Sequence, residues 1–200
     1  MITYYAKPLA KLINKLEGFP GVGSKSAQRM AFYILNLPPE EATALCEAII
    51  DVKRSIKECP ICHNLSSDDI CEICSAPDRE KDKLCIVAEV KDIISMEKTN
   101  EFHGVYHVLG GVIDPFNKKG PDNLNIKDLV ERVSKSTFEE VVIAVNPTVE
   151  GDTTALYLAG LLKNLVKKIT RIGSGLPVGA DMDYVDQATM TKALRARTEM

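Results

Sequence analysis

Residues 59–74 read CPICHNLSSDDICEIC, so two Cys-x-x-Cys pairs are separated by eight residues. Two thiolates on each of two tight turns can meet at the corners of a tetrahedron, which is the geometry of structural Zn²⁺ sites. The stretch has few large apolar side chains, too few to offset the conformational entropy lost on ordering it. Zinc can offset that loss, because it contributes about 10–16 kcal/mol of apparent free energy in small peptides. The stretch predicts a closed, non-catalytic site with one structural zinc ion, held by Cys59, Cys62, Cys71 and Cys74.

Three other interpretations of these cysteines stay open. CPIC followed by His63 matches the haem-attachment pattern Cys-x-x-Cys-His. Covalent haem requires export, yet the first 15 residues, MITYYAKPLAKLINK, contain no apolar stretch of signal-peptide length. A redox or disulfide role is disfavoured in an unexported chain, since its compartment is reducing, and His63 could replace one cysteine as a zinc ligand. The remaining cysteines, Cys46 and Cys85, have apolar neighbours and are predicted to be buried packing residues.

Composition and charge give a different kind of information. With 200 residues and 45% hydrophobic content, the chain can bury one substantial core and a smaller unit. No apolar run approaches the roughly 20 residues of a membrane helix, so we expect a cytoplasmic protein. The net charge of −3 does not favour nucleic-acid binding, but residues 1–36 carry a net +4 and the other residues −7. This basic end could concentrate anion binding, although a solvated lysine face of an amphipathic helix would give the same charge count.

Hydrophobic periodicity predicts an α+β multidomain chain. Amphipathic helices are expected at 7–17, from Ser24 to the Pro38-Pro39 pair, and at 40–57 with a stripe formed by Leu45, Ile49, Val52 and Ile56. After Pro77, short Val- and Ile-rich strands at 84–90, 105–109, 141–145 and 169–172 are separated by helical patterns at 91–99, 126–135 and 152–165. This alternation predicts right-handed crossovers and a mostly parallel sheet. A final helix is expected at 184–197, after a Gly-rich turn.

Residues 18–29, GFPGVGSKSAQR, predict a tight hairpin between the first two helices. The stretch fits neither a Walker loop nor a dinucleotide fingerprint, because Lys25 is displaced by one position and no strand precedes the loop. Phe19 is expected to pack inward, while Gly21 and Gly23 leave room for a ligand backbone to approach. The amides of residues 22–25 would form an anion site at a helix amino terminus, with Lys25 and Arg29 on one face beside it. The pattern predicts sequence-independent, salt-sensitive binding to a phosphodiester backbone, and the alternative is an ordinary helix corner with a glycine cap.

The chain resembles the RecR family of bacterial recombination mediators over almost its full length. The resemblance is carried by FPGVGSKSAQR, CPIC…CEIC, VYHVLGG, NPTVEGDTTALYLA and TRIGSGLPVGADMDYVDQATMTKAL. It implies a non-enzymatic DNA-repair protein that acts with RecO and RecF and helps load the recombinase onto single-stranded DNA covered by single-strand-binding protein. It also implies a homo-oligomer, from a dimer to a ring-shaped tetramer that surrounds DNA, in the bacterial cytoplasm at the nucleoid. The family's DNA-contacting lysine and arginine fall on Lys25 and Arg29.

The predicted domains follow from these motifs and the resemblance. They are a helix-hairpin-helix domain (1–57), a small four-cysteine zinc finger (58–78), a Toprim-like α/β domain (79–173) and a C-terminal Gly-rich turn and helix, expected to form a subunit interface (174–200).

The Toprim resemblance raises the question of catalysis. Catalytic Toprim modules hold Mg²⁺ with an Asp-x-Asp pair and a Glu, but here Asn146 and Thr148 stand in place of the two aspartates. The remaining carboxylates, Glu89, Glu150 and Asp152, are predicted to be a docking surface for RecO or RecF, or else a weak metal site. A metal-dependent nuclease or primase-like enzyme is therefore the alternative function. A zinc-containing transcription factor is disfavoured, because no recognition helix with base-reading side chains is evident.

Three residues beside these motifs remain without a chemical role at this stage. His103 and His107 are expected to be structural histidines, and the specific roles of Tyr106 and His107 stay open.

Overall fold

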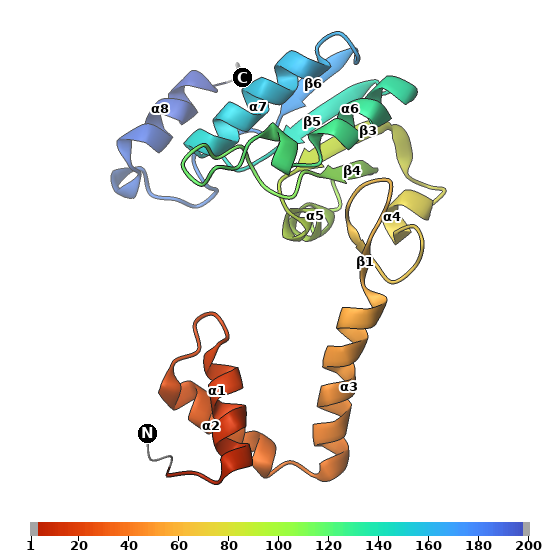
Figure 1. Ribbon diagram of the computed structural model, residues 1–200. Coiled ribbons are helices and arrows are strands. Elements are labelled where there is room, and N and C mark those ends of the chain that lie inside the picture. The colour runs from red at the N-terminus through yellow and green to blue at the C-terminus, as the bar shows by residue number, and fades with distance from the viewer. Residues whose placement is uncertain (1–3, 198–200) are drawn as a thin grey trace. The chain divides into compact units, whose positions relative to one another are not determined.

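The computed structural model describes residues 4–197. The chain is an α+β protein that divides into two compact units, one up to Ile56 and one from Lys57 onward (Figure 1). The first unit is helical, and the second contains the cysteine-rich segment, a parallel sheet and the C-terminal helix. Within residues 4–197, none of the helices has both the length and the apolar character that crossing a bilayer requires.

The first unit contains α1 (Lys7–Glu17), α2 (Ser24–Leu35) and α3 (Pro39–Ser55), close to the predicted ranges. Pro8 in the first turn of α1 and Pro39 at the start of α3 fit these positions, because the first amides of a helix need no intrahelical acceptor. Helices α1 and α2 pack through Ile13 and the two fully buried alanines Ala27 and Ala31. The small alanine side chains let the two helices approach closely.

Helix α3 corrects one expectation about burial. No residue of α3 is buried, and its apolar stripe of Leu45, Ile49, Val52 and the following Ile56 is exposed by 41–61%. Cys46, predicted to be a buried packing residue, is exposed as well. The physical reason is that the buried cluster of this unit lies between α1 and α2, so no other element of the unit covers α3.

The second unit begins with the cysteine-rich segment. Strands β1 (Lys57–Glu58) and β2 (Leu65–Ser66) form a short antiparallel hairpin, and the one-turn helix α4 (Glu72–Ser75) follows. This small amount of regular structure agrees with the expectation that the segment cannot fold on apolar burial alone.

The sheet has four parallel strands in the order β4-β3-β5-β6. They are β3 (Glu80–Val87), β4 (Gly104–Val108), β5 (Glu140–Ala144) and β6 (Lys168–Arg171). The helices that connect them are α5 (Val90–Glu97), α6 (Ile126–Lys135, preceded by the 3-10 turn η1, Pro121–Asn123) and α7 (Val149–Leu162). Helices α6 and α7 cover one face of the sheet and α5 the other (Figure 1).

The first strand ends earlier than expected. The prediction of strand through residue 90 was wrong at this end, because Glu89 caps α5: the Glu89 amide donates to the Asp92 carboxylate at 2.8 Å, and the Asp92 amide bonds back to Glu89. The alternation along β3 is regular up to that point. Leu84 and Ile86 join the core under α6 and α7, whereas Cys85, buried as predicted, and Val87 join the cluster under α5.

The described part of the chain ends with the 3-10 turn η2 (Met182–Tyr184) and α8 (Gln187–Arg195). Neither element contains a buried residue. Helix α8 contacts the sheet domain through polar groups, since the Lys192 ammonium lies 3.4 Å from the Asp152 carboxylate and 3.3 Å from the Pro147 carbonyl.

Candidate metal centre and nucleic-acid interface

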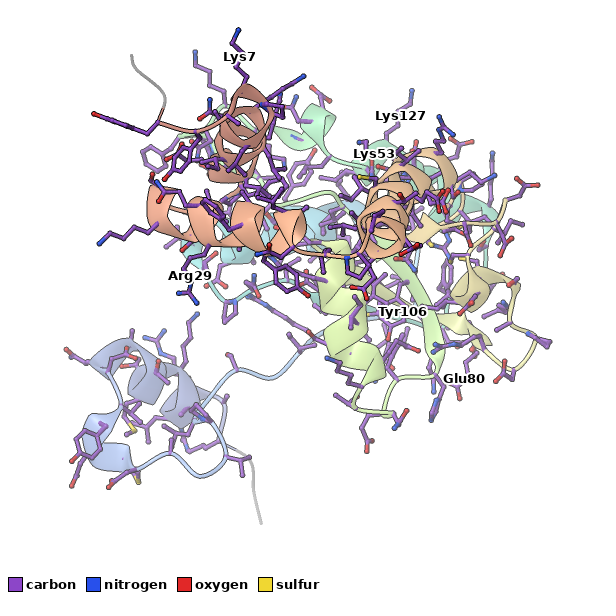
Figure 2. The ribbon with its side chains drawn as sticks, turned by 90° about the horizontal axis from the view of Figure 1, so that it is seen from below. Lys7, Arg29, Lys53, Glu80, Tyr106 and Lys127 are labelled. Atoms are coloured by element: carbon purple, nitrogen blue, oxygen red, sulfur yellow. The ribbon has the colours of Figure 1, made fainter. Side chains whose placement is uncertain are left out.

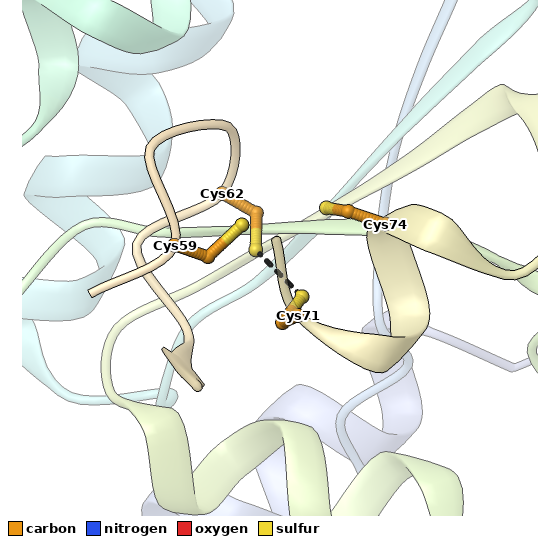
Figure 3. A group of neighbouring side chains, drawn as sticks. All are labelled: Cys59, Cys62, Cys71 and Cys74. Atoms are coloured by element: carbon orange, nitrogen blue, oxygen red, sulfur yellow. Dashed lines mark hydrogen bonds between the residues drawn. The ribbon is translucent and has the colours of Figure 1, made fainter. Parts of the chain in front are cut away.

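The four cysteines gather at one point (Figure 3), and their Sγ atoms all lie within 4.8 Å of one another. Zn–S bonds of 2.3 Å in a tetrahedron place the sulfurs roughly 3.8 Å apart. The Sγ atoms of Cys62 and Cys71 are 3.5 Å apart, too far for a disulfide and close to the zinc geometry, and all four cysteines are free thiols. Three of the four residues are buried, and four sulfur donors leave no position for water or substrate. The donor set therefore fits a closed structural zinc site.

Local backbone bonds form the two turns that carry the ligands. In the first turn, the His63 amide donates to the Cys59 carbonyl at 2.9 Å, and His63 adopts a left-handed φ of 60° that closes the turn. The Cys59 amide donates to the Asn64 carbonyl at 2.7 Å. In the second turn, Cys71 stands at the amino terminus of α4 and accepts the Ser75 amide at 3.0 Å.

The thiols have unequal proton affinities. Burial raises the pKa of Cys71 to about 11, and a hydrogen bond with Cys74 together with burial raises the pKa of Cys62. Burial also raises the pKa of Cys59, but backbone hydrogen bonds from Cys71, Ile61 and Cys62 outweigh this effect and lower the pKa to about 7. Zinc must therefore displace protons from at least two thiols when it binds, and its binding releases protons to solvent.

His63 lies outside the metal-binding group. Its Nδ1 lies 3.3 Å from a Glu58 oxygen and its Nε2 lies 3.0 Å from an Asp128 oxygen. Within residues 4–197, the one group of three or more potential ligands is the cysteine quartet. The positions of His63 and of the second Cys pair thus favour ligation by the four cysteines over both His63 ligation and haem attachment.

His107 and Tyr106, whose roles the sequence left open, join structural networks. His107 is fully buried, its ring lies 5.2 Å from that of His63, and burial lowers its pKa to about 4. Its Nε2 lies 2.8 Å from the Asn125 carbonyl, which can only accept, so the neutral ring carries its proton on Nε2. Tyr106 is also fully buried, and its hydroxyl donates to the Glu97 carboxylate at 2.6 Å. His103, by contrast, is exposed.

The hairpin between α1 and α2 presents a bare backbone. Gly21 has a left-handed φ of 77°, and a Cβ added at Gly21 or Gly23 would meet no atom within 4 Å. No side chain caps the amino terminus of α2. Lys25 and Arg29 are exposed one turn apart on α2, and Figure 2 shows the Arg29 side chain projecting away from the helix. Among the described residues neither cation is in an ion pair, so both are available to an anionic ligand.

Phe19 does not pack inward, which corrects one expectation about this hairpin. Its side chain is 56% exposed, and Val22 packs against Ile13, Ala27 and Ala31 instead. The turn closed by the Val22 amide and the Phe19 carbonyl at 3.1 Å directs Val22, three residues on, toward the helices.

The structure does not gather the three acidic residues of the sheet domain into one metal-binding group. Glu89 caps α5 and pairs with Lys91 at 2.6 Å, while Asp152 pairs with Arg171 at 2.5 Å, which holds the pKa of Asp152 below its usual range. Glu150 lies in the first turn of α7. Thr148 is the N-cap of α7, because its hydroxyl accepts a hydrogen bond from the Gly151 amide at 3.2 Å.

The sequence did not predict the charged residues whose hydrogen bonds link the elements of the second unit. Arg79 bonds to the Glu97 carboxylate and to the carbonyls of Phe102 and Gly104. Arg132 on α6 donates to the Tyr106 carbonyl of β4 at 2.6 Å. A signal for Arg132 was present in the sequence, since it lies between Leu129 and Val133 on the apolar stripe of its helix. No sequence pattern predicted the acceptor of its hydrogen bond, the Tyr106 carbonyl, which lies 26 residues away in the sequence.

Four family models match the chain. Three are RecR models: the helix-hairpin-helix model matches residues 9–53, the four-cysteine zinc finger domain model matches residues 56–76, and the C-terminal model matches residues 175–198. The fourth, described as a Toprim domain, matches residues 82–173. The zinc finger match agrees with the geometry of the quartet, and the chain therefore carries one structural zinc ion.

Relatives of nearly equal length are named recombination protein RecR. Those from Cyanothece sp. and Pelotomaculum thermopropionicum are 47% identical over 204 residues and 49% identical over 199 residues, and each alignment covers the whole of both chains. One from Carboxydothermus hydrogenoformans is 50% identical over 194 residues, covering 97% of this chain and 98% of the relative.

Proposed function

The chain belongs to the RecR family of recombination proteins, and we propose that it is a non-enzymatic, DNA-binding mediator of recombinational repair. The observation that carries this proposal is the hairpin of the first unit. There, exposed Lys25 and Arg29 stand beside two bare glycines and the uncapped start of α2. Helix-terminal amides and cations bind phosphate without reading bases, so the binding is independent of sequence and covers both single- and double-stranded DNA.

Several subunits act together on one DNA. A single hairpin supplies few phosphate contacts, and linking several hairpins raises the effective concentration of each by orders of magnitude. The exposed stripe of Leu45, Ile49 and Val52 on α3 supports such an assembly, because a contiguous apolar helix face is typical of an interface. Among its described residues, the C-terminal segment 174–200 also exposes large apolar side chains, including Val178 and Leu194, and serves as a second subunit contact. The assembly ranges from a dimer to a ring of four that surrounds DNA.

The sheet domain meets RecO or RecF through the surface around Glu89, Glu150 and Asp152, and so helps load the recombinase onto single strands covered by single-strand-binding protein. The loss of the paired aspartates supports docking over catalysis: Thr148 is a helix cap, and Asp152 is neutralised by Arg171. The match to a Toprim domain keeps a metal-dependent nuclease or primase-like enzyme as the alternative. Cleavage or primer synthesis with Mg²⁺ or Mn²⁺ that is lost in Glu150→Ala would favour the enzyme.

DNA binding is tested by fluorescence anisotropy with unrelated duplexes and single strands over a range of salt concentrations. The double variant Lys25→Ala, Arg29→Ala is expected to lose most of its DNA affinity and to keep stoichiometric zinc. The slope of log K against log salt should fall in magnitude by about 0.9 for each phosphate contact removed. Lys53→Ala, Arg54→Ala is the matched control, because it removes the same charge from the last turn of α3. Equal affinity of the hairpin variant and the control would refute the assignment.

A further inference from the structure

The zinc finger rests on two elements of the sheet domain. The Val108 amide of β4 donates to the carbonyl of the ligand Cys62 at 2.8 Å. Ile73, between the second pair of cysteines, packs against the apolar cluster that contains Tyr106 and Val108. The ring of His63 meets the Asp128 carboxylate of α6. The metal-binding quartet therefore lies at a seam between the finger and the sheet domain.

Arg132 occupies this seam, one helical turn after Asp128. Its guanidinium donates to the Tyr106 carbonyl at 2.6 Å, two residues before the amide that holds Cys62, and lies 5.9 Å above the centre of the Phe138 ring. The side chain is partly buried, and among residues 4–197 it forms no ion pair with a carboxylate. A cation removed from water without a counter-charge is costly, so the position needs an anion that the protein's carboxylates do not supply.

The zinc centre is such an anion. Four thiolates and one Zn²⁺ carry a net charge of −2, and Cys59, Cys62 and Cys71 are at most 2% exposed. Burial lowers the pKa of Arg132, whereas all four cysteines act in the opposite direction and favour its charged form. The Tyr106 carbonyl that accepts from Arg132 and the Val108 amide that donates to Cys62 are two residues apart on β4, so the cation and the metal-binding quartet are held at the same seam.

We propose that Arg132 is the counter-cation of the zinc centre and that it couples zinc binding to the seating of the finger on the sheet domain. Its charge stabilises the thiolate form of the ligands, and its bond to Tyr106 fixes that charge to β4. Lys81 is a second cation nearby, donating to the Cys74 carbonyl at 2.8 Å. Lys81 is exposed, so solvent screens its charge and its contribution is small. It supplies the matched control.

The test measures zinc affinity of the full chain by competition with a chromogenic chelator. Arg132→Gln removes the charge and keeps a hydrogen-bond donor, Arg132→Lys keeps the charge, and Lys81→Gln removes the screened charge. Outer-shell partners of metal ligands are worth about 10–100-fold in affinity. Arg132→Gln should therefore bind zinc at least 10-fold more weakly, whereas Arg132→Lys and Lys81→Gln should stay within about 3-fold of the parent.

A second readout, thermal stability, separates this role from simple packing. The thermal midpoint of Arg132→Gln should fall in the zinc-loaded protein and stay near the parent's after chelation, whereas a packing role would lower both midpoints equally. Parent-like zinc affinity in Arg132→Gln, or equal losses in the Gln and Lys variants, would overturn the proposal. If Arg132→Gln does not fold, the Lys variant decides: parent-like affinity supports the proposal, and a 10-fold loss rejects it.

Discussion

Replacing Gly151 by alanine would place a Cβ 1.9 Å from the backbone oxygen of Asn146. That oxygen would have to move by about 1.5 Å to reach ordinary contact distance. It cannot move freely, because it accepts the Thr148 amide at 2.9 Å and because the next residue, Pro147, has a fixed φ. The glycine at position 151 is therefore required by close packing of the turn that leads from β5 into α7.

The net effect can be estimated from three contributions. Overpacking a tight site costs about 1–3 kcal/mol. Loss of the hydrogen bond from the Thr148 amide to the Asn146 oxygen costs about 1 kcal/mol. Alanine in a helix recovers about 1 kcal/mol relative to glycine. Gly151→Ala should therefore destabilise the fold by about 2 kcal/mol, which lowers the thermal midpoint by about 4–8 °C for a domain of this size.

Gly160 supplies the internal control. It lies in the same helix, and a Cβ added there meets no atom within 4 Å. Gly160→Ala should therefore raise the midpoint by up to about 4 °C through helix propensity alone. Scanning calorimetry of both variants with excess zinc measures the difference. A Gly151→Ala protein that melts at or above the parent's temperature would show that the turn relaxes and would refute the reasoning.

Two further predictions concern the buried residues of β4. Tyr106→Phe removes the hydroxyl that donates to Glu97 and should lower the free energy of unfolding, measured by urea titration, by about 1.5 kcal/mol, since the acceptor is charged but keeps Arg79. Tyr33→Phe, at an exposed position, should lower it by less than about 0.5 kcal/mol in the same measurement. His107 has a folded pKa of about 4, below its unfolded value of 6.5, so the unfolded chain binds more protons and stability falls as the pH drops below 6.5. Between pH 7.5 and pH 5 the parent should lose about 2 kcal/mol more than His107→Gln, and equal losses would mean that folding does not lower the pKa of His107.

The sequence was most informative where the pattern itself contains the geometry. Cysteine spacing alone identified the zinc ligands, because two short turns leave few ways to arrange four sulfurs. Alternation of short strands and helices predicted the parallel sheet, since right-handed crossovers restrict the topology. Helices α1 and α6 also lie close to their predicted ranges, because the spacing of their apolar residues follows the helical period.

Burial was predicted less well, because an apolar stripe says which face is apolar but not what covers it. Cys46 and the stripe around Ile49 illustrate this, since both are exposed on a correctly predicted helix. Phe19 was misplaced because the turn at Gly21 directs Val22 inward instead. Contacts such as Arg132 with Tyr106 depend on how distant segments meet, and a local pattern does not contain that information.

The distribution of charge explains why this chain would need to act as several copies. The first 36 residues carry a net +4, while the rest of the chain carries −7 and repels DNA. Attraction is therefore limited to the basic end, and two hairpin cations per subunit release few counterions from DNA. Each further hairpin on the same DNA adds its own release and binds at high effective concentration. Because these contacts ignore base sequence, such an assembly would hold DNA through the number of its weak contacts, and losing one subunit would weaken binding steeply.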